Sequence, residues 1–179
     1  MKKITLLLGI LLLSHSMCNA EINRTIYGIP LLTSISNAKQ YLGNKGIKYE
    51  TQQTELGYTI FGTGNIVFAN IRWSSIIISV RKGKVFNIGF VKDSDDSEII
   101  SQNYMRIVDN LKEKYNEYIQ QPIRQESNAA MSFSINFDDN QTMILTSCEI
   151  NAFDNSSIMI TYVDKVMYQE YQQAGKDDL

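Results

Sequence analysis

The stretch Met131-Ser132-Phe133-Ser134-Ile135-Asn136-Phe137 alternates apolar and polar side chains at every position. Because successive side chains of a β-strand point to opposite faces of the sheet, this alternation predicts a strand with one buried face and one open face. The turn residues Asp138-Asp139-Asn140 lead from it into Thr142–Phe153, and a second turn at 154–156 leads into Ser157–Val163. Short connections of this kind favour antiparallel pairing, so three antiparallel strands are expected here.

A second group of strands is predicted upstream, where short apolar runs are separated by glycine-containing turns at Gly57, Thr63-Gly64 and Lys82-Gly83. The five runs are Ile47–Gln53, Tyr58–Gly62, Asn65–Trp73, Ser75–Arg81 and Lys84–Lys92. Within the fourth run, residues 76–78 are all isoleucine, which favours a central strand covered on both faces.

Three helices are predicted around these strands. The first is about ten residues long, begins after a cap at Thr33 or Ser34 and ends at Gly46. The second runs from Ser97 to Tyr115, because six apolar residues recur at steps of three and four over this range. The third covers Lys165–Gln173 and ends at Gly175.

The expected fold class is therefore α+β, with an antiparallel sheet of about seven or eight strands and helices packed on one face. The order is helix, five strands, helix, three strands, helix. Since a helix followed by strands occurs twice, the order also suggests a degenerate tandem repeat.

Residues 1–20 have the pattern of a cleavable signal peptide. Lys2 and Lys3 precede the apolar run Ile4–Leu13, and Ala20 offers a small residue at the cleavage site. The run has about half of the roughly 20 apolar residues that a membrane-spanning helix needs, and no later run is longer. We expect residues 21–179 to form a single exported domain, periplasmic or extracellular and not membrane-spanning. A lipid anchor at Cys18 is the alternative, although Met17 does not fit the small residue that normally precedes a lipidated cysteine.

Removal of the signal peptide would change the chemistry available to the protein. The only histidine, His15, would be lost, and Cys148 would be the single cysteine. Without Lys2 and Lys3, 15 basic residues remain against 19 acidic ones, a net charge of −4. Nucleophilic systems that use histidine, and zinc sites built from histidine and cysteine, would be excluded. A mildly acidic domain also lacks the basic surface that nucleic acids require. No cofactor, no metal and no catalytic residue are therefore predicted.

Three further features have a chemical and a structural interpretation. The acidic run Asp93–Glu98 suggests calcium, but residue 98 stands where a calcium loop has glycine, so capping of the following helix is favoured. Asp138 and Asp139 could form a glycosidase pair, but acidic residues are common at hairpin turns. Cys148 lies in an apolar run, which favours a buried inert thiol over a reactive one.

Short motifs along the mature chain resemble those of small exported proteins from gut bacteria of the Bacteroides type. They are Tyr27-Gly28-Ile29-Pro30-Leu31 with the segment 43–47, the helix 104–115 ending in Lys114-Tyr115, and Ile160-Thr161-Tyr162-Val163-Asp164. Asn116 departs from the glycine expected after Lys-Tyr. The helix-and-sheet repeats of these proteins are similar to the fold of β-lactamase inhibitor proteins, which bind other proteins through a sheet face. The resemblance implies such a fold and transfers no site residues.

Aromatic residues are concentrated in the first group of strands, and Tyr58, Phe61 and Trp73 are the candidates for contact with a partner. Our first hypothesis is an exported, non-enzymatic interaction module that binds an unidentified envelope or extracellular protein through a sheet face. The alternative is a periplasmic protein that binds a small ligand or a carbohydrate. A flat exposed aromatic patch would favour the first and a concave pocket the second. The sequence leaves the oligomeric state open.

Overall fold

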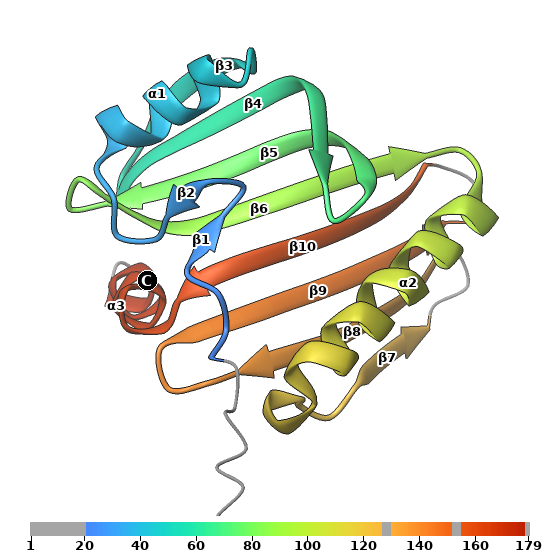
Figure 1. Cartoon of the computed structure of the whole chain (residues 1–179). Helices are drawn as coiled ribbons and strands as arrows, with labels where there is room; N and C mark the ends of the chain where they lie inside the picture. Colours follow the sequence, from blue (N-terminus) through green and yellow to red (C-terminus); the bar gives the residue numbers. More distant parts are fainter. Residues whose placement is uncertain (1–20, 127–129, 152–154, 178–179) are drawn as a thin grey trace, which may run out of the picture.

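The computed structural model describes residues 21–126, 130–151 and 155–177, and an eight-stranded antiparallel sheet dominates it (Figure 1). The elements are β1 (Thr25–Ile26), β2 (Ile29–Pro30), α1 (Ile35–Asn44), β3 (Lys48–Thr54), β4 (Gly57–Phe68), β5 (Ile71–Arg81), β6 (Lys84–Ser94), α2 (Ser97–Tyr115), η1 (Asn116–Tyr118), β7 (Ile123–Glu126), β8 (Ala130–Asp138), β9 (Thr142–Asn151), β10 (Ser156–Asp164) and α3 (Lys165–Asp177). The chain is α+β, as predicted.

The strand order in the sheet is β3-β4-β5-β6-β10-β9-β8-β7. Strands β3 to β6 pair in chain order, and so do β7 to β10, so each half of the sheet is an antiparallel meander. The halves meet where β6 pairs with β10, for example at Phe90 opposite Ile160. The last strand of the chain therefore lies in the interior of the sheet.

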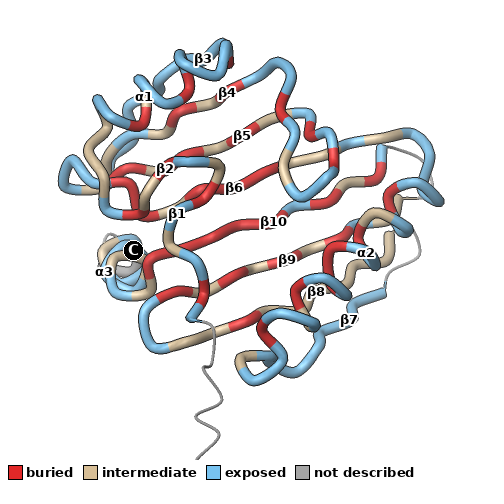
Figure 2. Tube along the Cα trace, viewed as in Figure 1, coloured by how far each residue is buried: buried red, intermediate tan, exposed pale blue. Residues whose placement is uncertain are grey.

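One face of this sheet is covered by α1, α2 and the β1–β2 hairpin (Figure 1). The core lies between these elements and the sheet, and Figure 2 shows the buried positions along β6, β10 and the inward sides of α1 and α2. The fully buried side chains on the sheet include Ile60, Ile76, Ile78, Ile88, Phe90 and Ile158. We call this side of the sheet the inner face and the opposite side the outer face.

Helix α2 forms as the sequence predicts. The Asp96 carboxylate accepts hydrogen bonds from the backbone N–H groups of Glu98 and Ile99, at 3.0 and 3.1 Å, and so caps the first turn. The apolar stripe faces the sheet, with Ile100, Tyr104, Ile107, Val108, Leu111 and Tyr115 all buried. The predictions of a capping role for the acidic run and of a buried stripe are both confirmed.

Helix α1 and the β5–β6 hairpin also match their predictions. Ser34 caps α1 by accepting a hydrogen bond from the Asn37 N–H at 3.2 Å. Lys82 and Gly83, both with positive φ, form the turn between β5 and β6.

Helix α3 lies on the outer face, at one end of the sheet. Its Tyr171 contacts Phe86, with the ring centroids 5.3 Å apart, and also contacts the Arg81 guanidinium. Arg81 follows the buried inner-face residue Val80 in β5, so its side chain points to the outer face. The prediction that the helices share one face therefore holds for α1 and α2 and fails for α3. The helix also continues to Asp177, so the prediction that it ends at Gly175 is wrong.

The first group has four strands rather than five. Thr63-Gly64 does not form a turn: β4 runs through it, with a register shift between Thr63 and Ile66. The bulge lets Ile66 reach the core, while the chain reverses at Ala69-Asn70, both at positive φ. The run 76–78 is buried on one face only, because Ile77 is half-buried on the outer face while its neighbours are fully buried. Strands β1, β2 and β7 were not predicted.

The signal peptide and part of the turn predicted at 154–156 lie outside the described residues.

Candidate functional site

The structure separates the three aromatic residues proposed for partner contact. Trp73 is 2% exposed and its Nε1–H donates a hydrogen bond to the Phe68 carbonyl at 3.0 Å, so it belongs to the core and the prediction of a surface role is wrong. Tyr58, 41% exposed, pairs with the inner-face residue Val80. Phe61 pairs with Ile77 on the outer face and is half-buried. The three residues therefore do not form one aromatic platform.

The outer face carries a continuous apolar strip that the sequence did not single out as a unit. Its members, which we call the outer-face patch, are Phe61, Ile77, Val91, Leu145 and Met159. Phe61 pairs with Ile77 across β4 and β5, and Val91 pairs with Met159 across β6 and β10. Leu145 pairs with Thr161, two residues from Met159, so it is a diagonal neighbour of Met159.

The outer-face patch is accessible. Met159 is 42% exposed, and the other four side chains are half-buried. Among the described helices, α3 packs on the outer face, where its Tyr171 contacts Phe86. Small polar side chains border the patch, including Ser75 opposite Val91 and Ser147 opposite Met159. An apolar strip with a polar border is the composition of many protein–protein contact surfaces.

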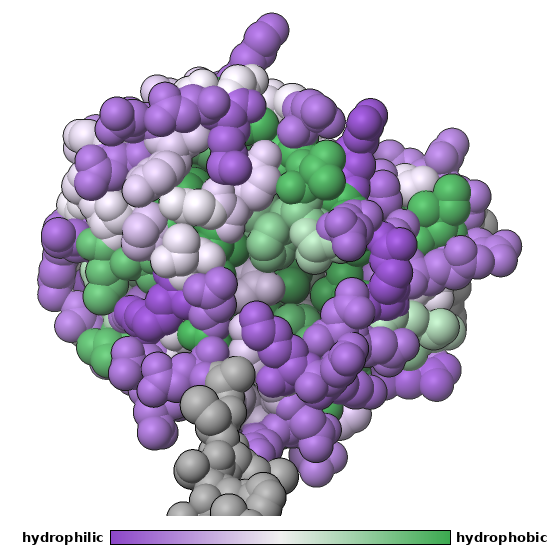
Figure 3. Space-filling view, in the orientation of Figure 1, coloured by the Kyte–Doolittle hydropathy of each residue, from purple (hydrophilic) through white to green (hydrophobic). Residues whose placement is uncertain are grey.

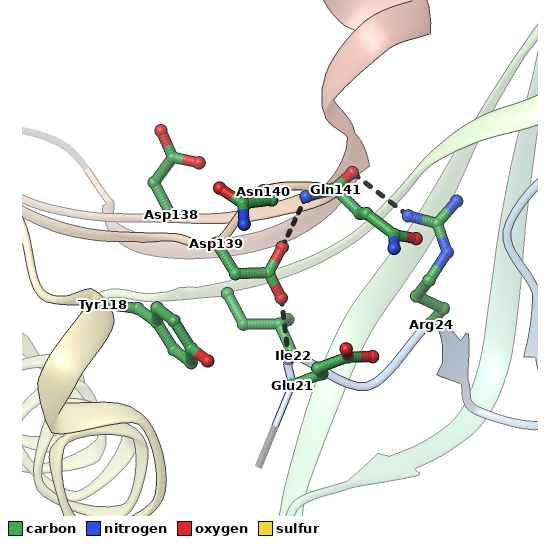
Figure 4. A pocket seen from close by; sticks show the side chains of 8 residues that line it. All are labelled: Glu21, Ile22, Arg24, Tyr118, Asp138, Asp139, Asn140 and Gln141. Carbon is green, nitrogen blue, oxygen red and sulfur yellow. Dashed lines mark hydrogen bonds between the residues drawn. The ribbon is translucent and has the colours of Figure 1, made fainter. Parts of the chain in front are cut away.

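A polar pocket of about 210 Å³ lies at the β8–β9 turn, where the N-terminal segment crosses it (Figure 4). Its lining residues are Glu21, Ile22, Arg24, Tyr118, Asp138, Asp139, Asn140 and Gln141. The Asp139 carboxylate accepts hydrogen bonds from the N–H groups of Ile22, Gln141 and Thr142 at 2.6 to 2.8 Å. Asp138 accepts two hydrogen bonds from the Lys165 ammonium, at 2.7 and 2.9 Å.

These bonds give both aspartates a structural role. Asp139 closes the β8–β9 turn and holds the N-terminal segment, and Asp138 holds the start of α3. Both carboxylates are therefore engaged in contacts that hold the fold together. The turn interpretation is therefore favoured over a glycosidase pair, as in the sequence analysis.

A second cavity, of about 220 Å³, opens on the inner face beside α2. We call it the apolar cavity; its lining residues are Asn23, Ile26, Phe68, Ala69, Trp73, Ile107, Asn110, Leu111, Lys114, Tyr115, Ile160 and Tyr162. Figure 3 shows apolar surface in the middle of this face, surrounded by hydrophilic surface. The walls come from β1, the β4–β5 turn, α2 and β10, so residues far apart in the sequence build it.

Two tyrosines place hydroxyl groups in this apolar setting. The Tyr115 hydroxyl accepts a hydrogen bond from the Asn23 N–H at 3.3 Å. Within the described residues the Tyr162 hydroxyl forms no hydrogen bond, although the side chain is only 6% exposed. Burial, with a smaller contribution from nearby Tyr115, raises the pKa of Tyr162, so the Tyr162 hydroxyl stays protonated and can donate.

Cys148 is 2% exposed, and burial raises the pKa of its thiol from 9.0 to about 11. A neutral, buried thiol is a poor nucleophile, which favours the inert interpretation. Across the described part of the chain, no group of three or more His, Cys, Asp or Glu side chains could hold a metal ion. None of the described helices is both long and apolar enough to cross a membrane.

The fold and the sites define an α+β protein with an antiparallel sheet, an apolar strip on one face and a small apolar cavity on the other. No protein-family model, no curated protein and no solved structure matches the chain.

Proposed function

We propose that this chain is an exported, non-enzymatic binding protein that contacts a protein partner through the outer face of its sheet. The outer-face patch is the observation that supports the proposal most directly. Its five apolar side chains come from β4, β5, β6, β9 and β10, and none of them is fully buried. Burial of exposed apolar surface is the main favourable term in protein association, at about 25 cal/mol per Å².

The resemblance to exported proteins with a fold like that of β-lactamase inhibitor proteins supports the same proposal, since those inhibitors bind through a sheet face. The engagement of Asp138 and Asp139 in structural hydrogen bonds also agrees with a protein that does no chemistry.

Photo-cross-linking in the cells that make the protein tests this proposal. A photoreactive amino acid is placed at Ser147, beside Met159 on the outer face, and as a control at Ser101, on the solvent side of α2. We expect a discrete protein adduct from position 147 and none from position 101. Adducts from both positions, or from neither, would contradict a specific outer-face contact.

Charge insertion gives an independent test. Met159→Glu should abolish the adduct, because a carboxylate in the centre of an apolar contact has to be desolvated on binding. Met105→Glu is the matched control: Met105 is 56% exposed on α2, against 42% for Met159. An adduct that survives Met159→Glu would show that the partner contacts another surface.

The proposal of export has its own test. We expect the mature chain to start at Glu21 and to carry no lipid, because Ala20 offers a cleavage site and the residues before Cys18 fit a lipidation site poorly. Intact-mass analysis of native protein would measure this. A diacylated Cys18 would contradict the proposed start.

A further inference from the structure

We infer that the apolar cavity binds a small carboxylic acid with an aromatic or short hydrocarbon part. This site is separate from the proposed protein contact, because the cavity opens on the inner face and the outer-face patch on the other. The two proposals can therefore fail independently.

The size of the cavity limits the class of ligand. Its volume is about 220 Å³. An engineered apolar protein cavity of about 150 Å³ holds benzene, so this one has room for a benzene ring and a few more atoms. Drug-sized ligands occupy pockets of about 300 Å³ or more, which makes a small molecule the better match.

The side chains of the cavity walls favour a ligand whose larger part is apolar. Ile26, Ile107, Leu111, Ile160 and Trp73 all line the cavity and are at least nine-tenths buried. Their contacts favour hydrocarbon or an aromatic ring over a sugar, whose hydroxyl groups would lose their hydrogen bonds to water here.

The tyrosine hydroxyls favour a ligand that carries a hydrogen-bond acceptor at one end. Tyr162 has a proton to donate and no hydrogen-bond partner among the described residues. An acceptor on a ligand would give this hydroxyl a hydrogen-bond partner in an apolar setting, where such a bond is stronger than in water. Tyr115 accepts from Asn23 and still has its own proton, so two phenolic donors line one small space.

The rim of the cavity favours a negative charge on that acceptor. Lys114 is the only charged residue in the lining, and its ammonium lies 5.1 Å from the centre of the Tyr115 ring. Among the described residues it forms no ion pair. A carboxylate would therefore meet a cation and two hydroxyl donors, whereas the neutral amide would lose the ionic contribution.

Trp73 gives a direct signal for the experiment, because it is the only tryptophan in the chain and it lines the cavity. The probe is 3-phenylpropionate, titrated against the folded protein at neutral pH, with 3-phenylpropionamide as the uncharged comparison. We expect a saturable change in tryptophan fluorescence with the acid, and binding of the amide weaker by about tenfold.

Two variants locate the site. Tyr162→Phe removes only the unpartnered hydroxyl and Lys114→Glu reverses the charge at the rim, so each should weaken binding of the acid about tenfold or more. Lys112→Glu, on the same helix but outside the lining, should leave binding unchanged and controls for net charge. Lys114 is exposed, so its variant stays interpretable if Tyr162→Phe impairs folding.

Three results would overturn the inference: no saturable signal with either probe, equal binding by Lys114→Glu and the unaltered protein, or equal binding of acid and amide. A photoreactive residue at Asn110, on the rim, tests whether a protein partner occupies the cavity instead of a small acid. A protein adduct from that position would show that a partner's side chain fills the cavity in place of a small acid.

Discussion

The Arg24 guanidinium donates a hydrogen bond of 2.5 Å to the carboxylate of Asp164, which lies 140 positions further along the chain. Arg24 also donates to the Gln141 carbonyl and to the Thr142 hydroxyl, at 3.1 and 3.0 Å. Asp164 in turn accepts from the Met167 N–H at 3.0 Å and so caps α3. One ion pair thus joins the N-terminal segment, the start of β9 and the start of α3.

Loss of this carboxylate should be costly. Asp164 is 5% exposed, so Asp164→Ala leaves Arg24 without its charged partner and removes the cap of α3. We expect a loss of about 2–4 kcal/mol in the free energy of unfolding, measured by urea melts.

The pair between Lys82 and Glu170 is the control, since it also involves α3 but its side chains are 66% and 44% exposed. Glu170→Ala should shift the urea midpoint far less, because water screens exposed charges. Equal shifts for the two variants would mean that burial does not set the strength of the Arg24–Asp164 pair.

Helix α2 offers a test of packing between adjacent positions. Leu111 is 7% exposed against the sheet, so Leu111→Ala should cost about 2–5 kcal/mol through lost burial and the space left behind. Lys112 is not among the buried residues of α2, so Lys112→Ala should stay within about 0.5 kcal/mol. Urea melts at matched pH measure both. A Leu111→Ala variant as stable as Lys112→Ala would contradict the packing of the stripe.

Asp96 tests the role of the acidic run. Its carboxylate caps α2, so Asp96→Ala should cost about 1 kcal/mol. Thermal melts of the unaltered protein should coincide in millimolar calcium and in chelator. A reproducible rise in melting temperature with calcium, lost in Asp96→Ala, would show that the run binds the ion, by mass action on the native state.

Gly57 should tolerate no side chain. Its φ is +151°, and a Cβ at this position would lie 2.0 Å from the Val80 carbonyl oxygen, which is backbone. Gly57→Ala must therefore move β4 away from β5, and we expect it to be among the more destabilising single changes. Gly43→Ala is the comparison, since nothing lies within 4 Å of its added Cβ and alanine favours helix. If the melting temperature fell equally in Gly57→Ala and Gly43→Ala, the close approach of Gly57 to the Val80 carbonyl would be contradicted.

Stability should be lost at alkaline pH. Burial raises the pKa of Cys148 from 9.0 to about 11, and it raises the pKa of Tyr104 and Tyr162 as well. Each group therefore holds its proton more tightly in the folded chain than in the unfolded one. Their contribution is fully present below about pH 9 and declines as pH rises towards 11.

Urea melts between pH 8 and pH 11 measure this loss. Cys148→Ala should lose less of its stability over that range than the unaltered protein, because one of the three groups is gone. An identical decline in both proteins would show that the thiol does not contribute.

Local features of the sequence predicted the helices α1 and α2 well. Caps at Ser34 and Asp96 and the spacing of apolar residues are set within a few positions, so they can be read directly. The turn at Lys82-Gly83 belongs to the same class of signal.

Features set by tertiary contacts were not predictable. Thr63-Gly64 has the composition of a turn, yet pairing with β5 keeps β4 extended and places a bulge there. The sequence could not say which of the aromatic residues in this region belong to the core, and the packing around Trp73 places it there. The apolar cavity joins residues from position 23 to position 162, a separation that leaves no local signal in the sequence.

The interior position of β10 has a consequence for the order in which the molecule folds. The hairpins β3 to β6 and β7 to β9 connect neighbours in the chain and can form early, whereas β10 has to enter between β6 and β9. Until residues 156–164 arrive, both halves present an unpaired strand edge to solvent, and such edges invite aggregation. A nascent chain therefore completes its sheet only after residues 156–164 have been synthesised.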